Sequence, residues 1–61
     1  MDDGFNMSMR KFLKQVGITS QKAIEDALRD AGNGSYKVDA KIVIEEVGLE
    51  HKVSGTITIE D

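Results

Sequence analysis

The sequence predicts an α+β protein in which two short helices pack on a C-terminal antiparallel β-hairpin. Three observations lead to this prediction. The first half of the chain has an apolar pattern with the 3.6-residue helical period, the second half changes to the period of two typical of strands, and glycine-containing breaks separate the periodic segments. We expect helices at about residues 5–16 and 20–31 and strands at about 36–47 and 51–60, within one α-α-β-β domain, residues 1–61.

The first expected helix, residues 5–16, depends on a stripe of apolar side chains along one face. The stripe recurs at spacings of four, three, one and three residues, and it consists of Phe5, Met9, Phe12, Leu13 and Val16. Gly17 is expected to end this helix, because glycine readily takes the left-handed conformation found at many helix C-termini.

The second expected helix, residues 20–31, begins almost at once. Thr19 or Ser20 is a suitable N-cap, and Ile18 can pack back over the first turn. The expected buried stripe consists of Ala23, Ile24, Ala27, Leu28 and Ala31, and Gly32 ends the helix. On the outer side we expect the charge pairs Lys22–Asp26 and Glu25–Arg29.

The two expected strands alternate apolar and polar residues, so each has one buried and one solvated face. The apolar positions are Val38, Ala40, Ile42 and Ile44 in the first strand and Val53, Ile57 and Ile59 in the second. Gly48-Leu49 suits a two-residue turn of type II′, and a four-residue loop from Val47 to Glu50 preserves the same register.

This register places Glu45 opposite Lys52 and Lys37 opposite Glu60 on the outer face. On the inner face it pairs Ile44 with Val53, Ile42 with Gly55, Ala40 with Ile57 and Val38 with Ile59. A register slipped by two residues would oppose Asp39 and Glu60, so we prefer the first. Because either hairpin edge can accept another strand, edge pairing across a two-fold axis would give a four-stranded dimer.

Length and composition favour association with a partner. A chain of 61 residues buries only about 60% of the surface that its unfolded form exposes, and the absence of cysteine excludes disulfides and thiolate zinc sites. Small domains without such staples commonly oligomerise. The net charge of −3 gives no general attraction to nucleic acid or to an anionic membrane. Asp2 and Asp3 stand where a secretory signal would be basic, and no apolar run approaches the ~18 residues of a membrane span, so we expect a soluble cytoplasmic protein.

No constellation of residues predicts an enzyme. His51 has Glu45, Glu46 and Glu50 near it in sequence, but glutamates on both faces of a hairpin do not converge on a metal or a substrate, and a solvated histidine is expected. No phosphate-binding glycine loop and no serine or threonine beside a histidine is present. We therefore expect no catalytic residue, cofactor, metal or small-molecule substrate. Tyr36 is expected to cap the open end of the core.

The candidate partner-binding residues lie in the first expected helix. Arg10, Lys11 and Lys14 concentrate positive charge in a chain that is otherwise acidic, which predicts contact with an acidic partner. Phe5 and Met7, if exposed together, would form a small apolar docking patch at the N-terminus.

Nucleic-acid binding is the alternative, because two helices around a glycine turn have the outline of a helix-turn-helix. The second helix would read the bases, yet its exposed face carries Glu25, Asp26 and Asp30 against Lys22 and Arg29. Phosphates would repel such a helix, so this composition argues against nucleic acid as the partner.

The N-terminal half also resembles a known family. Residues 5–18 contain the words Phe5-Asn6-Met7-Ser8 and Arg10-Lys11-Phe12-Leu13-Lys14, followed by Ser20-Gln21 and Ile24-Glu25, and the β-rich half contains Val47-Gly48-Leu49. In these motifs the chain resembles a family of short uncharacterised bacterial proteins that is classed as a domain of unknown function. The resemblance implies a bacterial cytoplasmic setting and no catalytic activity. The expected function is a small non-enzymatic protein-interaction module, acting as a homodimer or as an accessory subunit of a larger assembly, with a helix-turn-helix nucleic-acid-binding regulator as the alternative.

Overall fold

The structure, a computed structural model, describes residues 3–60 and confirms an α+β chain with a C-terminal β-hairpin. Asp2 and the outer limits of the expected domain, residues 1 and 61, lie outside this range. The chain divides into two compact units, Met1–Ala31 and Gly32–Asp61, the first containing helix α1 and the second the hairpin. A single domain over residues 1–61 stays a prediction.

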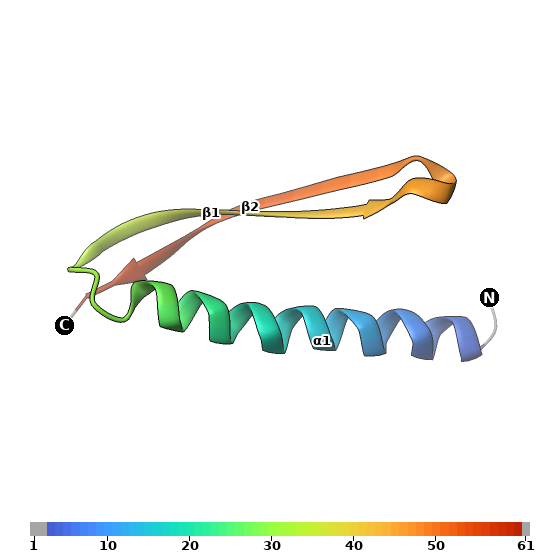
Figure 1. The fold of residues 1–61 in the computed structure, drawn as a ribbon, viewed down its shortest axis with the longest axis horizontal. Coiled ribbons are helices and arrows are strands. Elements are labelled where there is room, and N and C mark those ends of the chain that lie inside the picture. Colours follow the sequence, from blue (N-terminus) through green and yellow to red (C-terminus); the bar gives the residue numbers. More distant parts are fainter. Residues whose placement is uncertain (1–2, 61) are drawn as a thin grey trace. The chain divides into compact units, whose positions relative to one another are not determined.

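The prediction of two helices is wrong, because one uninterrupted α-helix, α1, runs from Asp3 to Leu28 (Figure 1). Gly17 is helical and does not end it. A glycine in a helix interior costs about 0.5–1 kcal/mol relative to alanine, which a long helix tolerates. The two expected stripes are also in phase: at about 100° per residue, Phe5, Val16 and Ala23 fall within about 20° of one another on the helix surface.

Thr19 is inside the helix and caps nothing. Its Oγ1 donates a hydrogen bond to the carbonyl of Gln15 at 2.8 Å, the back-bond that threonine makes within a helix. Ile18, expected to cover the first turn of a new helix, is 60% exposed. The helix ends at Leu28, three residues earlier than expected, with the amide of Ala31 bonded to the carbonyl of Leu28 at 3.1 Å.

The hairpin consists of strands β1 (Gly34–Ile44) and β2 (Leu49–Ile59), joined by the 3₁₀ turn η1 (Glu45–Val47) and Gly48 (Figure 1). Both strands begin and end two or three residues away from the expected bounds, except that β2 ends at residue 59, one residue early. Gly48 has φ 68°, a left-handed conformation that favours glycine, and its amide bonds to the carbonyl of Glu45 at 3.2 Å. The connection is therefore a four-residue loop and not a two-residue turn.

This loop moves the register by four residues from the expected one. Ile44 lies opposite Leu49, Ala40 opposite Val53 and Lys41 opposite Lys52. The expected pairs Glu45–Lys52 and Lys37–Glu60 are absent, because Glu45 is in the 3₁₀ turn and Lys37 faces Thr56. A shift by an even number of residues leaves each side chain on its predicted face, so the apolar face was predicted correctly.

No residue is buried among residues 3–60. The half-buried side chains are Val16, Ile24, Leu28 and Ala31 in the helical unit and Tyr36, Val38, Ile42, Ile57 and Ile59 in the hairpin. The hydroxyl of Tyr36 donates a hydrogen bond of 2.6 Å to the carbonyl of Gly32, which ties β1 to the segment before it. Neither unit encloses a core of its own.

Candidate interaction surfaces

Arg10, Lys11 and Lys14 lie in the middle of α1 and are all exposed. Arg10 and Lys14 are four residues apart and Lys11 and Lys14 are three apart, so the three side chains emerge from one side of the helix. Residues 4–24 contain no aspartate or glutamate. No acidic residue of α1 is therefore within the three- or four-residue reach that a helical ion pair needs.

The helix places Phe5 and Met7 on opposite sides and does not form the predicted joint patch. They are two residues apart, which is about 200° around the helix axis. Phe5, 47% exposed, belongs to the apolar stripe. Met7, 69% exposed, lies one and two turns before Lys11 and Lys14 on the basic side.

Ile18 also belongs to the basic side, and the sequence reasoning missed it. It follows Lys14 by four residues and Lys11 by seven, so it lies on their face of the continuous helix. The spacing was visible in the sequence, but the assumed break at Gly17 concealed it. We define the basic face of α1 as Met7, Arg10, Lys11, Lys14 and Ile18.

The other side of α1 is an apolar stripe that keeps one phase on both sides of Gly17, with the polar residues Thr19 and Ser20 between Val16 and Ala23. Several of its large members are about half exposed: Met9 at 40%, and Phe12 and Leu13 at 52% each. Val16, Ile24 and Leu28 are half-buried. A partner could therefore contact this apolar stripe along most of the length of α1.

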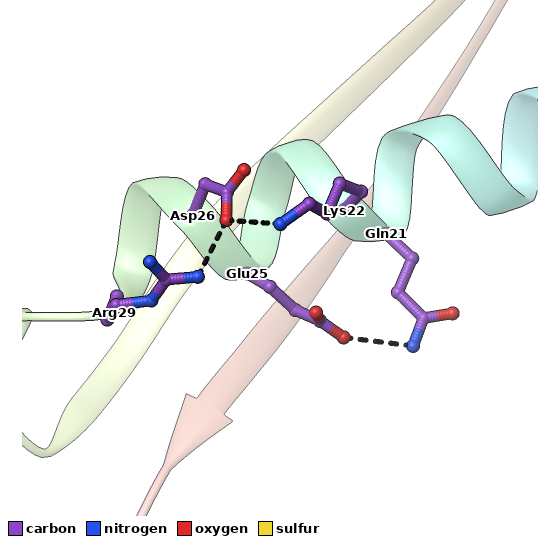
Figure 2. A network of polar contacts seen from close by, with 5 residues as sticks. All are labelled: Gln21, Lys22, Glu25, Asp26 and Arg29. Atoms are coloured by element: carbon purple, nitrogen blue, oxygen red, sulfur yellow. Dashed lines mark hydrogen bonds and ion pairs between the residues drawn. The ribbon is translucent and has the colours of Figure 1, made fainter.

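Lys22 in α1 and Arg29 just after it share one carboxylate, whereas no ion pair within residues 3–60 involves Arg10, Lys11 or Lys14. Asp26 Oδ1 accepts hydrogen bonds from Lys22 Nζ at 3.0 Å and from Arg29 Nη2 at 2.8 Å (Figure 2). The expected Lys22–Asp26 pair is confirmed, whereas Arg29 pairs with Asp26 and not with Glu25. Glu25 instead accepts a 3.1 Å hydrogen bond from Gln21 Nε2.

The polar face of the hairpin holds a cluster of charges around Lys41. Lys41 lies directly opposite Lys52, a like-charge pair that opposes strand pairing. Glu50, diagonal to Lys41, offsets this repulsion through an ion pair of 3.2 Å between Lys41 Nζ and Glu50 Oε1. Nearby, Asp39 Oδ1 accepts a 2.6 Å hydrogen bond from Ser54 Oγ.

His51 is exposed in β2 and lies opposite Ile42, on the apolar face of the hairpin. Its sequence neighbour Glu50 is on the polar face, because successive residues of a strand point to opposite sides. Across residues 3–60, no three histidine or acidic side chains are grouped so that they could hold a metal ion. Within the same range, no helix combines the length and the apolar character that crossing a membrane requires.

Over residues 3–60, the fold and the surfaces define a small α+β protein with one amphipathic helix, one two-stranded hairpin and exposed apolar faces on both. The model of a protein family described as "Family of unknown function (DUF6494)" matches residues 1–60. The chain belongs to that family, which agrees with the expectation of an uncharacterised domain family. Comparisons with curated proteins and with solved structures gave no match.

Proposed function

We propose that this chain is a small, non-enzymatic protein-interaction module that acts as a homodimer or as an accessory subunit of a larger assembly, in a bacterial cytoplasm. The observation that carries the proposal is the absence of any buried residue between positions 3 and 60, in a chain with an apolar stripe on α1 and an apolar face on the hairpin.

Covering the apolar stripe of α1 and the apolar face of the hairpin would contribute favourable free energy to binding. Burying a fully exposed leucine, valine or phenylalanine side chain contributes about 1.5–3 kcal/mol. Phe12, Leu13 and Val53 are each 52% exposed, so covering their remaining surface would contribute roughly half of that for each. Most helical stability in proteins comes from packing an amphipathic face, and a two-stranded hairpin alone is marginal in water. A partner that covers these faces would stabilise both units.

The basic face of α1 supports an acidic protein as one such partner. Arg10, Lys11 and Lys14 have no carboxylate within helical reach, while the downstream pair Lys22 and Arg29 share Asp26. Charges that a helix leaves unpaired are available to steer and orient a partner of opposite sign. Exposed Met7 and Ile18 add adaptable apolar contacts beside them.

The alternative, a helix-turn-helix regulator, is the weaker proposal. That motif needs two helices at a steep angle, with the second in the major groove. In α1 the expected turn, residues 17–19, is helical. Nothing in the geometry of α1 favours nucleic-acid binding over protein binding.

Charge reversal tests the acidic partner. We expect Arg10→Glu, Lys11→Glu and Lys14→Glu together to abolish binding of a protein that the tagged wild-type chain captures from its native host. The matched control reverses Lys22, Arg29 and Lys37, which gives the same change of net charge away from the basic face. Circular dichroism establishes that both variants keep their helix.

Retention of every captured protein by the first variant would contradict a role for the basic face. Equal loss in both variants would attribute capture to net charge alone, which would contradict the proposed surface as well.

A further inference from the structure

The outer edge of β1 pairs with no other strand within residues 3–60. Within residues 3–60 the sheet contains only β1 and β2, so each strand has one edge whose backbone groups pair with no strand. Such an edge is a template for another strand. The polar face of β1 carries Lys37, Asp39 and Lys41 at alternate positions, a pattern of signs that can complement itself when the strand is inverted.

We propose that this edge binds the same edge of a second copy of the chain, antiparallel, with the two-fold axis at Ala40, to form a four-stranded sheet. In this register Asp39 lies opposite the partner's Lys41, and the symmetry repeats the pair. On the apolar face Val38 lies opposite the partner's Ile42, and Tyr36 opposite the partner's Ile44.

The charges already present in the hairpin favour this pairing. Lys41 and Lys52 lie opposite each other, and Glu50 is the one carboxylate that pairs with Lys41 among the described residues. The partner's Asp39 would bring a second carboxylate to these two lysines. Asp39 bonds Ser54 through Oδ1, and Oδ2 has no hydrogen-bond partner within residues 3–60.

Competing registers are less favourable. An axis at Asp39 would oppose Asp39 to itself and Lys37 to the partner's Lys41, which are like-charge pairs. An axis at Val38 pairs Lys37 with Asp39 but leaves Val43 and Ile44, 51% and 44% exposed, without partners.

The edge of β2 offers less. Its charged residues on the polar face are Glu50 and Lys52, and they oppose each other only when the axis is at His51. That register overlaps residues 49–53 alone, whereas the Ala40 register overlaps residues 36–44.

This inference rests on the homodimer form of the proposed function and names its contact. It is independent of the basic face of α1, so the two proposals fail separately: reversal of Arg10, Lys11 and Lys14 leaves the β1 edge intact, and substitutions in β1 leave the basic face intact.

A charge swap measured by sedimentation equilibrium tests the proposal. We expect a dimer for the wild type and at least about tenfold weaker dimers for Asp39→Lys and for Lys41→Asp, because two attractive pairs become repulsive. An equal mixture of the two variants is expected to dimerise again, since positions 39 and 41 are then both lysine in one chain and both aspartate in the other. Lys37→Asp is the matched control, because Lys37 lies opposite the partner's Val43.

Recovery in the mixture separates lost contact from lost folding, because a variant that does not fold cannot recover by mixing. A wild-type monomer would overturn the proposal. A dimer that neither single variant weakens, a mixture that stays monomeric, or a mass that grows without limit as concentration rises would do the same.

A cysteine probe tests the position of the axis. The chain has no cysteine of its own, and directly opposed residues have Cα atoms about 4.5–5.5 Å apart, within the range of a disulfide. Oxidation should link Ala40→Cys chains into dimers and leave Thr56→Cys chains, on β2, unlinked. Equal linking of both, or linking of Thr56→Cys alone, would contradict an axis at Ala40.

Discussion

Gly17 lies inside α1, and a Cβ added there would meet no atom within 4 Å. Gly48, in contrast, has φ 68° in the hairpin loop. Both glycines were expected to interrupt a periodic segment, and only Gly48 does. A glycine marks a stop only where a positive φ is required, and the sequence around Gly17 carried the evidence against a stop: the chain has no proline, and the apolar stripes on its two sides share one phase.

Replacing Gly17 by alanine should stabilise the protein by about 0.5–1 kcal/mol, because alanine loses less backbone entropy in a helix and meets open space here. Urea unfolding followed by circular dichroism measures the change. A loss of stability would contradict the continuous helix, because with open space around the added Cβ only a positive φ would make alanine unfavourable at this position.

Replacing Gly48 by alanine should destabilise the protein by about 1 kcal/mol, because an L-residue in the left-handed region is strained. Gly48→Asn is the control and should cost less, since asparagine tolerates this conformation. An alanine variant as stable as the wild type in the same urea titration would exclude a left-handed residue at this position.

At the scale of the element, the sequence predicted the faces of the hairpin and missed its register. The period of two assigns each residue to a face, and that assignment survives any even shift. Register depends on the turn and on cross-strand pairs worth only about 0.2–1 kcal/mol each. The observed register follows the 3₁₀ turn at Glu45–Val47, although it places Lys41 opposite Lys52. A choice of register by charge pairs alone would have rejected it.

The observed register and the register expected from sequence predict opposite changes in hairpin stability for one substitution at Lys52. Lys52→Glu places a carboxylate opposite Lys41 and should stabilise the hairpin by a few tenths of a kcal/mol, up to about 1. In the register expected from sequence, the same change would oppose two glutamates, at positions 45 and 52, and destabilise it. Chemical denaturation of this variant, with Lys37→Glu as the control opposite uncharged Thr56, distinguishes the two.

The basic face of α1 was predicted only in part, because the sequence indicated local spacing better than it indicated the limits of the helix. Arg10, Lys11 and Lys14 share a side of α1 because they are spaced by three and four residues. This spacing is so short that the prediction held although the expected length of the helix was wrong. Ile18 was missed on that side because of the false break at Gly17. Phe5 and Met7 were expected to form one patch, although a separation of two residues places them on opposite sides of the helix. Local spacing was sufficient to place the two lysines and the arginine on one side of the helix. Placing Ile18 with them required the correct end of the helix.

At the scale of the whole molecule, composition predicted a chain with little core, and residues 3–60 include no buried side chain. A chain of 61 residues without cysteine has few means of stabilising itself except association. We therefore propose that the folded state of this chain is completed by a partner, and that a second copy of the chain serves as one.

Thermal unfolding at different protein concentrations tests that claim most directly. If two copies complete the fold, mass action makes the unfolding midpoint rise by about 5–10 °C over a hundredfold increase in concentration. A cooperative transition whose midpoint is the same at every concentration, from a species with the mass of one chain, would contradict it.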